Sequence, residues 1–584
     1  MRGVWVASLG IDWPKVKGTS STEIAAQKQQ LLEIFNSHKS SGINAIFFHI
    51  RPKCDAVYKS SIEPWSRYLT GKDGLAPIDT AFDPLRFAIQ EAHKRAMELH
   101  VWINPYRVNS SEDDPGVVSD MHVLKRHPEW VLKCSENEYR ILNPGLPEVR
   151  AYLLYVIMDI LRRYDIDGIH FDDYFYPSKS YGVYNDDSAF NKYKGNFTDR
   201  ALWRKNNVNL LLSMINDSIK AVKPWVKFGI SPMSSPASNE NIYCDAFSWL
   251  KGNYTDTSGI IHSGKPYIDY ILPQFYLVEY GGRLSYWSGE STLNGRHFYA
   301  GLGASYYEAE NWTPYEPGWE IRTNRTTPTC QGQVFFSSHA LTVKNYAGCT
   351  DSLKHNYFVY PAITPKMGWL PGGNKKPNAP GNLRFIKNPA NDQYEFIWDK
   401  PSPTADGDTA SIYVIYRFDH LPGLSDLENP ANMAGYTGET SLPVTDLKLS
   451  ATNGNYFAVT AFDRYSNESQ MSNIFYIDMP GQVPAPAIPV YPEDNNKTQR
   501  TSAILIWVND PLVQSYVLQV SKDSAFKQIT ANYLELKSNS AVVNGILHDQ
   551  RYYWRVKACG IGGSSSYSSP FRFESGIAFF PLSP

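Results

Sequence analysis

The chain has little net charge and no apolar run long enough to cross a membrane. Its 584 residues include 56 Lys and Arg against 58 Asp and Glu, which gives a formal net charge of −2. Nucleic-acid-binding proteins carry basic patches, so this balance gives no electrostatic case for a nucleic-acid partner. No stretch approaches the roughly 20 apolar residues of a transmembrane helix. We therefore expect neither a nucleic-acid partner nor a transmembrane segment.

Cysteines are few, and their spacing does not suit a metal site. The six are Cys54, Cys134, Cys244, Cys330, Cys349 and Cys559, without Cys-x-x-Cys or Cys/His ligand patterns. We expect mostly buried or free thiols, with Cys330 and Cys349 as the pair expected to form any disulfide. His-Glu-x-x-His, calcium-loop and Gly-x-Ser-x-Gly patterns are also missing. The sequence therefore implies no metal, no cofactor and no serine-nucleophile elbow.

Aromatic residues, in contrast, are abundant. They make up 14% of the chain, with 39 Tyr and 15 Trp. Such rings suit stacking on sugars, and they equally suit any β-rich secreted protein. No signal peptide is visible, because Met1 to Trp5 leads directly into an apolar segment. This start suggests a mature form from which an export signal has been removed.

Residues 1–370 alternate short apolar segments with amphipathic ones. Eight strands are predicted, at 3–7, 45–50, 101–104, 168–171, 227–231, 268–273, 297–301 and 333–336. The clearest helices are predicted at 22–41, 84–100, 147–164, 201–222 and 345–356. This alternation favours an α/β TIM (β/α)8 barrel with long loops. A doubly wound open sheet is the alternative, but no Gly-rich phosphate loop follows the first strand.

The remainder of the chain has a different pattern. Residues 371–380 form a Pro/Gly-rich linker, and 480–492 form a second proline-rich one. After each linker come short alternating strands, which indicate two all-β sandwiches of about 100 residues each. We predict a barrel at 1–370 and sandwiches at 381–480 and 484–584.

The most informative stretch is 164–177. A helix ends there, Gly168 to Phe171 follows as a short buried strand, and Asp172 and Asp173 stand at its C-terminal end. Parallel α/β barrels carry their chemistry at strand C-terminal ends. Carboxylates beside aromatic rings suit cleavage of a sugar–sugar bond. The alternative is that the two aspartates form a helix cap or a surface turn.

Several motifs occur in order at predicted strand ends. They are Arg2-Gly3-Val4-Trp5-Val6-Ala7, Ile11-Asp12-Trp13-Pro14, His49-Ile50-Arg51-Pro52, Glu63-Pro64-Trp65-Ser66-Arg67-Tyr68-Leu69-Thr70-Gly71, Asn104-Pro105-Tyr106-Arg107, Gly168-Ile169-His170-Phe171-Asp172-Asp173-Tyr174-Phe175-Tyr176-Pro177, Gly229-Ile230-Ser231-Pro232 and Pro273-Gln274-Phe275-Tyr276. With these motifs, residues 1–370 resemble the bacterial glycosyl-hydrolase-like family 10, formerly a domain of unknown function. The two sandwiches look like fibronectin type III modules, on Trp398 with 456–461 and on Trp507 with 553–558.

The family resemblance implies a TIM barrel in an exported or lipid-anchored protein that hydrolyses glycan strands. One cell-division member acts on peptidoglycan whose stem peptides have been removed. The expected location is therefore the cell envelope, periplasmic or at the outer surface, with a polysaccharide or peptidoglycan glycan as the partner. The chain departs from many relatives after Tyr276, where Leu277-Val278-Glu279 replaces a Trp.

Asp172 is the first choice for the catalytic carboxylate and Asp173 the second. The stretch is also similar to the chitinase strand-four motif, with Tyr174 at the position of that motif's acid. A substrate-assisted mechanism, in which the sugar's acetamido group is the nucleophile, would need only one protein acid. The sequence does not identify a second carboxylate; the loop candidates are Asp55, Glu63, Asp245 and Glu279.

The substrate-binding candidates lie on the predicted barrel strands or in the loops that follow them. They are His49, Arg51, Trp65, Asn104, Arg107, His170, Tyr174, Gln274 and Tyr276. Arginine there would fork onto carboxylates or carbonyls. The alternatives are structural ion pairs for Arg51 and Arg107 and a core position for His170.

Two classes of function remain open. The first is a glycoside hydrolase acting on an amino-sugar polymer. The second is a barrel without catalysis that only holds a glycan, with the sandwiches as spacers. Barrels host both, so the fold alone does not decide. Deacetylation would need a metal triad that the sequence does not offer.

Overall fold

The computed structural model describes most of the chain. The described residues are 1–109, 118–136, 138–178, 182–276, 280–289, 293–306, 316–373, 375–390, 394–405, 409–447, 456–477, 484–498, 502–508, 513, 515–547, 549–560 and 563–575. The chain forms two compact units. One comprises Met1–Ala347, Ile363–Lys376 and Phe462–Glu468, and the other comprises Gly348–Ala362, Pro377–Ala461 and Ser469–Pro584. The predicted domain boundaries remain predictions.

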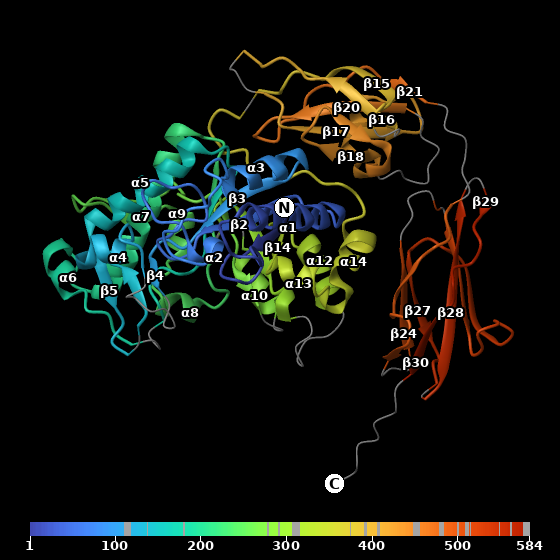
Figure 1. Ribbon diagram of the computed structural model, residues 1–584, viewed down its shortest axis with the longest axis horizontal. Helices are drawn as coiled ribbons and strands as arrows, with labels where there is room; N and C mark the ends of the chain where they lie inside the picture. The colour runs from blue at the N-terminus through green and yellow to red at the C-terminus, as the bar shows by residue number, and fades with distance from the viewer. Residues whose placement is uncertain are drawn as a thin grey trace, which may run out of the picture. The chain divides into compact units, whose positions relative to one another are not determined.

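Eight parallel strands close into a barrel in the first unit (Figure 1). They are β1 (Arg2–Val6), β2 (Ala45–Arg51), β3 (Glu98–Ile103), β7 (Gly168–Phe171), β8 (Lys227–Ile230), β11 (Tyr270–Ile271), β13 (His297–Leu302) and β14 (Cys330–Phe335). Each pairs with the next in chain order, and β14 pairs with β1. Every predicted strand contributes, so the (β/α)8 barrel is confirmed.

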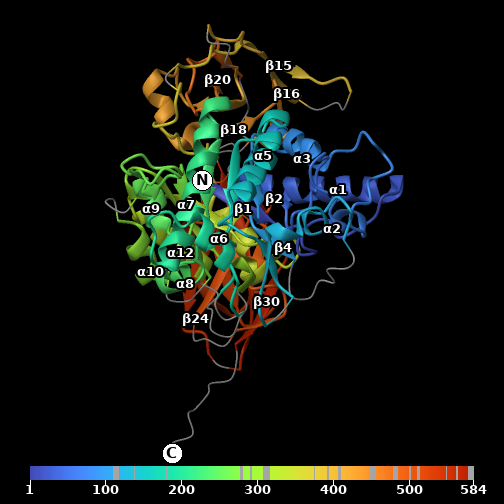
Figure 2. The same cartoon turned by 90° about the vertical axis from the view of Figure 1, so that its left-hand side faces the viewer.

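Helices connect these strands. The longer ones are α1 (Ser21–Ser40), α3 (Pro84–Lys94), α5 (Pro147–Arg163), α7 (Arg200–Val222) and α12 (Glu316–Thr326). Ser20 and Glu23 form a capping box that starts α1. Pro147 occupies the first turn of α5, as expected for a residue without a backbone N–H. Helices α5 and α7 pack against each other (Figure 2).

Shorter elements lie between them. In the first unit these are α2 (Arg67–Thr70), β4 (Arg107–Asn109), α4 (Val123–Arg126), η1 (Pro128–Trp130), β5 (Val131–Lys133), β6 (Arg140–Leu142), α6 (Asp187–Tyr193), α8 (Pro236–Asn241), α9 (Ala246–Lys251), β9 (Tyr254–Thr255), β10 (Ile261–His262), β12 (Gln274–Phe275), α10 (Tyr280–Trp287), η3 (Ala304–Tyr306) and α13 (Ser338–Thr342). The helix predicted at 345–356 was wrong as one element, because three short helices replace it: η4 (Tyr346–Gly348), α14 (Cys349–Ser352) and η5 (Leu353–Tyr357).

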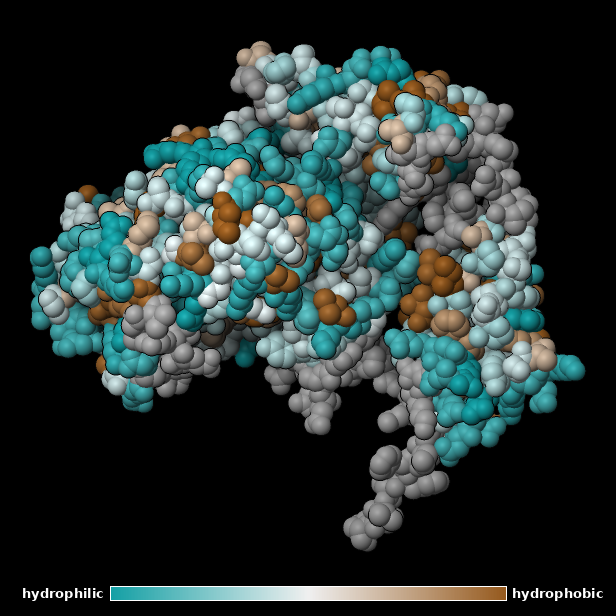
Figure 3. Space-filling view, viewed as in Figure 1, coloured by the Kyte–Doolittle hydropathy of each residue, from teal (hydrophilic) through white to brown (hydrophobic). Residues whose placement is uncertain are grey.

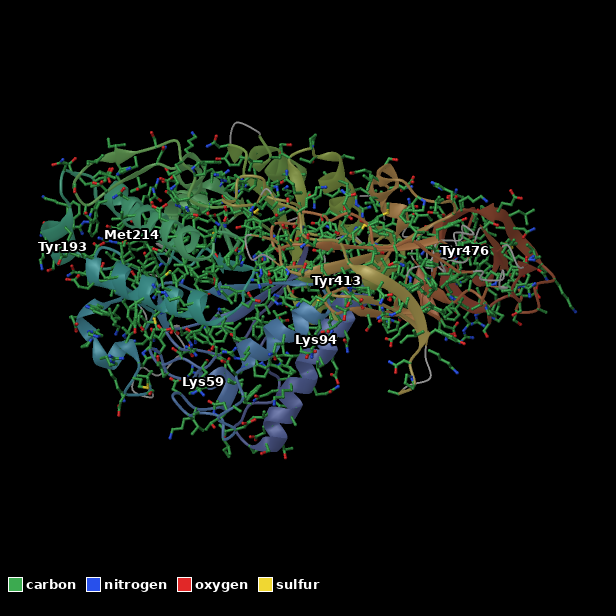
Figure 4. The ribbon with its side chains drawn as sticks, turned by 90° about the horizontal axis from the view of Figure 1, so that it is seen from above. Lys59, Lys94, Tyr193, Met214, Tyr413 and Tyr476 are labelled. Atoms are coloured by element: carbon green, nitrogen blue, oxygen red, sulfur yellow. The ribbon has the colours of Figure 1, made fainter. Side chains whose placement is uncertain are left out.

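The predicted helix at 84–100 was too long. Helix α3 ends at Lys94, which is labelled in Figure 4, and Ala96 adopts a left-handed backbone with φ of 52°. Such a residue stops a right-handed helix. The chain then enters β3 at Glu98, three residues before the predicted strand start. The apolar stripe of the helix runs on in sequence into the strand, which hid this boundary.

The segment 363–370 seals the N-terminal end of the barrel. Met367 and Leu370 belong to the same buried cluster as Trp5 and Tyr270 of the barrel interior. Trp369 Nε1 donates to Asp269, the residue before β11, over 3.0 Å. Thr364 donates to Glu98, the first residue of β3. The lower barrel core is therefore complete only when this segment is present.

We expect a fragment of residues 1–376 to fold and a fragment of residues 1–362 to fail. The shorter fragment loses Met367 and Leu370, and large-to-small changes at buried positions like these cost about 2–5 kcal/mol each. The measurement is urea unfolding followed by tryptophan fluorescence. Equal unfolding midpoints for the two fragments would contradict the role assigned to the segment. The longer fragment is the matched control, since it differs only by the seal and the six residues that follow it.

Two β-sandwiches follow in the chain. In the first, one sheet contains the strands β15 (Gly381–Lys387), β16 (Tyr394–Asp399) and β19 (Ser441–Pro443). The other sheet contains the strands β18 (Met433–Thr437), β17 (Ile412–Phe418), β20 (Tyr456–Phe462) and β21 (Phe475–Tyr476). In the second, one sheet contains the strands β22 (Pro489–Tyr491), β24 (Ser502–Trp507) and β27 (Ser540–Asn544). The other sheet contains the strands β23 (Asn496–Thr498), β30 (Phe571–Ser575), β28 (Arg551–Gly560), β25 (Ser515–Ser521) and β26 (Ile529–Leu536), and β29 (Gly563–Ser564) pairs with β28. Short helices η6 (Leu424–Glu428), η7 (Pro430–Asn432) and η8 (Val444–Asp446) lie in the first. Trp398 and Trp507 are buried in the two cores. The fibronectin type III assignment stays a prediction.

All six cysteines are free thiols. The predicted Cys330–Cys349 disulfide was therefore wrong. The Cys330 thiol instead donates to the carbonyl of Gly332 in its own strand region.

The face of the molecule seen in Figure 3 is a mixture of hydrophilic and apolar side chains. Across the described residues no helix combines the length and the apolar character needed to span a bilayer. Figure 3 shows apolar side chains over the barrel in small, separate patches among hydrophilic ones. Scattered apolar residues of this kind are ordinary for a folded surface.

Candidate functional site

The candidate residues gather at the carboxyl ends of the barrel strands. Asp172 and Asp173 come directly after β7, and Asn104 follows β3. His49 and Arg51 end β2, while Gln274 and Tyr276 come from β12 and the residue after it. All these strands run parallel, so their carboxyl ends meet at one rim. The parallel strands bring these residues to one end of the barrel; their roles stay predictions.

The Asp172 carboxyl lies buried at this rim and accepts two hydrogen bonds. Trp102 Nε1 donates to Oδ2 over 3.1 Å, and the backbone N–H of Tyr174 donates to Oδ1 over 3.1 Å. Burial, and then repulsion from Asp173, raises the pKa of Asp172 to about 7. Near neutral pH this carboxyl therefore exchanges a proton, as a general acid must.

The second carboxyl, that of Asp173, lies beside it. Because β7 has already ended at Phe171, the two aspartates are not forced to opposite faces of a strand. Gln274 Nε2 donates to Asp173 Oδ1 over 3.0 Å and to the carbonyl of Ser231. Burial also raises the pKa of Asp173. Two buried, interacting carboxyls titrate as a pair, so the proton on Asp172 also depends on the charge of Asp173.

Arg107 brings positive charge to this pair. Its guanidinium lies 3.6 Å from the centroid of the Tyr174 ring, and its Nε donates to the hydroxyl of Tyr139 over 3.1 Å. Among the described residues its terminal nitrogens have no hydrogen-bond partner. Tyr174 is 42% exposed. The charge of Arg107 lowers the pKa of both Asp172 and Asp173, which places this cation near the two acids.

His49 and Asn104 are buried beneath the rim. The His49 ring stacks on Trp102 with centroids 3.9 Å apart, and its Nε2 bonds Asn104 Oδ1 over 3.1 Å. Burial, and then Arg107, holds the pKa of His49 well below its usual value, so the ring is neutral. Within the described part of the chain, His49 Nδ1 and Asn104 Nδ2 have no hydrogen-bond partner. Both residues support Trp102.

Arg51 has the geometry of a structural ion pair. It is fully buried, with Nη2 donating to Glu63 Oε1 over 2.6 Å and Nε donating to Oε2 over 2.7 Å. Its Nη1 donates to the carbonyls of Asn104 and Pro105. No nitrogen of this guanidinium is left for a ligand. The salt-bridge alternative considered for Arg51 fits this geometry, whereas substrate binding does not.

His170 occupies the barrel interior below Asp172. Its Nε2 lies 3.3 Å from Trp5 Nε1 and 3.1 Å from the Ser231 hydroxyl, and its Nδ1 bonds the Tyr270 hydroxyl. Burial, and then His100, holds the pKa of His170 well below its usual value. The core-histidine alternative fits this position.

The remaining aromatic candidates are Tyr276 and Trp65. Tyr276 is half-buried, and Phe336 stacks against it at 5.5 Å. After burial, the charges of Asp173 and Tyr306 contribute to raising the pKa of Tyr276, so it lies near the acids. Trp65 is half-buried in the loop after β2, where its backbone bridges Ala56. Tyr276 thus lies near the two acids, and a binding role for Tyr276 or Trp65 stays a prediction.

Of the other carboxylates proposed from sequence, the three that lie in the described residues each have a hydrogen-bond or ion-pair partner. Asp55 is buried and accepts from the backbone N–H of Lys53, and Glu63 is bound to Arg51. Asp245 accepts from Asn209, and Glu279 lies outside the described residues. Asp173 is therefore the best-placed partner for Asp172. Within the described ranges no group of three or more His, Cys, Asp or Glu could hold a metal ion.

The contact of Trp102 with Asp172 was not among the predictions made from the sequence. The alternation of side chains along a strand could have indicated this contact. Trp102 lies two residues before Asn104, so both side chains face the same side of the strand. Tyr139, which holds Arg107, carried no comparable signal.

The sequence profile of the glycosyl hydrolase-like 10 family matches residues 1–284. Glycosyl hydrolase YngK of Bacillus subtilis (strain 168) is 35% identical over 496 residues, covering 81% of this chain and 92% of that protein. Glycosyl hydrolase DigH of Escherichia coli (strain K12) is 32% identical over 374 residues. The match covers 58% of this chain and 82% of that protein.

Among solved structures, the PgaB (BpsB) glycoside hydrolase domain from Bordetella bronchiseptica superposes with a TM-score of 0.39 at 9% identity, covering 56% of this chain and 93% of that one. Alpha-L-fucosidase isoenzyme 2 from Paenibacillus thiaminolyticus superposes with a TM-score of 0.37 at 14% identity. The superposition covers 60% of this chain and 50% of that one. Likeness this distant carries no argument about the site. The match to YngK over nearly its whole length, together with the profile match, shows that the chain belongs to the glycosyl hydrolase-like 10 family.

Proposed function

We propose that this protein is an O-glycoside hydrolase that cleaves an amino-sugar polymer, with peptidoglycan glycan strands as its substrate. One observation carries the proposal. A buried carboxyl with its pKa raised to about 7 stands beside a second carboxyl, at the strand end where barrel enzymes carry their chemistry. Glycoside hydrolysis needs an acid of this kind to protonate the leaving oxygen. Asp172 is that acid.

The neighbouring position of Asp173 favours a substrate-assisted mechanism. In two-carboxylate mechanisms a nucleophile or base faces the acid across the sugar, about 5–9.5 Å away. Asp172 and Asp173 instead come from one strand end. Here the carbonyl oxygen of the sugar's acetamido group attacks C1 as the C1–O bond breaks. Asp172 gives its proton to the leaving oxygen, and Asp173 accepts the acetamido N–H.

The second half of the reaction restores the acid. Water adds to C1, the bond from the acetamido oxygen breaks, and Asp172 takes up the water's proton. Arg107 lies where it can bind a polar substituent of the same sugar. The retained product keeps its acetamido group. With peptidoglycan as the proposed substrate, we propose a location in the cell envelope.

We expect soluble oligosaccharides from purified peptidoglycan after its peptides have been removed. The measurement is mass spectrometry of the products released by the full chain, from intact and from peptide-free glycan. A fully deacetylated glycan is the matched control and should resist cleavage, because its sugars lack the attacking oxygen. Co-sedimentation with the glycan without any release would support the binding-only alternative instead. Cleavage of the deacetylated glycan at an equal rate would rule out substrate assistance but not hydrolysis.

A further inference from the structure

Trp102 makes the one side-chain hydrogen bond that the described residues offer to Asp172. Its indole Nε1 donates to Oδ2 over 3.1 Å, and only the backbone N–H of Tyr174 donates otherwise. The indole is 8% exposed. An indole N–H only donates, so it bonds a carboxylate more strongly than a carboxylic acid. The contact therefore favours the form of Asp172 that exists after proton transfer.

The indole itself is held in a fixed plane. Its face stacks on the ring of His49, with an interplanar angle of 13°. His49 is in turn fixed by Asn104, whose Oδ1 only accepts, so the bonded Nε2 of the neutral ring carries the proton. His49 lies on β2 and Trp102 on β3, which pair in register at these two residues. Two rigid strands thus determine where Nε1 points.

We propose that Trp102 is a positioning residue for the acid-catalysed step. It sets the plane of the Asp172 carboxyl and stabilises the carboxylate left when the proton moves to the leaving oxygen. This inference rests on the proposed function, because it assumes that Asp172 is the acid. The positioning role depends on the indole N–H, which donates to Asp172, and not on the aromatic ring alone.

The test is Trp102→Phe in the full chain, which keeps a ring and removes the donor. Without the donor Asp172 becomes a weaker acid, so the basic limb of the kcat/KM profile on peptide-free glycan should move up by about one pH unit. At neutral pH kcat should fall about tenfold or more while KM changes little, because the lost interaction acts in the transition state.

Trp13→Phe is the matched control. Trp13 is fully buried, and its Nε1 donates to the carbonyl of Gln27 over 2.9 Å, so this variant also loses a buried indole bond. It should lower the melting temperature and leave the basic limb unchanged. If Trp102→Phe does not fold, benzothienylalanine at position 102 keeps the shape of the ring system and replaces the N–H by sulfur.

The outcomes separate the two proposals. An unmoved basic limb in a folded position-102 variant overturns the positioning role, whatever happens to stability. Wild-type turnover in an Asp172→Asn variant instead overturns the assignment of the acid, and with it the proposed mechanism. A shifted limb at position 102, with loss of activity at position 172, supports both.

Discussion

Asp172→Asn is expected to lower kcat/KM on glycan by about 10²–10⁴-fold, the usual contribution of a general acid. The amide has nearly the volume of the acid but cannot give a proton to the leaving oxygen. The loss should shrink on an aryl glycoside of the same sugar, whose leaving group departs without protonation. Steady-state rates on both substrates measure this difference.

Asp173→Asn supplies the contrast. This residue is proposed to hold the acetamido group, which both substrates use, so its loss should slow both by a similar factor. If instead Asp172→Asn slowed the aryl glycoside as strongly as the glycan, Asp172 would not be the acid.

The raised pKa of Asp172 also links activity and stability to pH. Turnover by the wild-type chain should fall as the pH rises through about 7, when the acid loses its proton. A carboxyl whose pKa is raised in the folded state stabilises the fold fully below its unfolded pKa, and this stabilisation is lost as the pH rises through the folded pKa. The free energy of unfolding of the wild type should therefore fall relative to Asp172→Asn by up to about 4 kcal/mol between pH 4 and 8. Urea unfolding at each pH measures the difference.

Glu63→Gln is expected to destabilise the barrel by about 3–5 kcal/mol, since it leaves the Arg51 guanidinium buried without a counter-charge. Both side chains of this ion pair are 0% exposed. The Tyr152 hydroxyl also donates to Glu63, so the variant disturbs two donors. Activity should fall as well, because Arg51 holds the carbonyls of Asn104 and Pro105 at the rim. Urea unfolding gives the loss of stability, and glycan turnover gives the loss of activity.

Two controls sharpen this prediction. Asp120→Asn removes the exposed pair with Lys125, and pairs of this kind are worth about 0–1 kcal/mol. The double variant Arg51→Met with Glu63→Leu should recover stability relative to Glu63→Gln, because it leaves no unpaired charge. An unchanged unfolding midpoint in Glu63→Gln would show that water reaches this pair.

The strands of the barrel could be predicted because each is a short buried run between clear helices or turns. The strand Gly168 to Phe171 was predicted to the residue. The boundary between α3 and β3 could not be, because the left-handed backbone of Ala96 has no signature in a residue type that prefers helices. Local sequence preferences do not report such a tertiary choice.

The position of the site could be predicted from the sequence, but the hydrogen-bond partners of its residues could not. Strand ends identify which residues reach the rim, and Asp172, Asn104 and Gln274 all do. Which atoms meet there depends on side chains from strands far apart in sequence, such as Trp102 on Asp172 or Gln274 on Asp173. Arg51 was left undecided for the same reason, since its partner Glu63 lies in a loop whose path the sequence does not fix.

The free thiols have a consequence for where this protein can fold. Burial raises the pKa of Cys54 to about 12 and that of Cys330 to about 11, so these thiols stay protonated and react slowly with oxidants. The chain needs no oxidase or disulfide isomerase to reach its folded state, because no cross-link has to form. We therefore expect Cys54 and Cys330 to stay reduced while the chain folds in an oxidising compartment as well as in a reducing one.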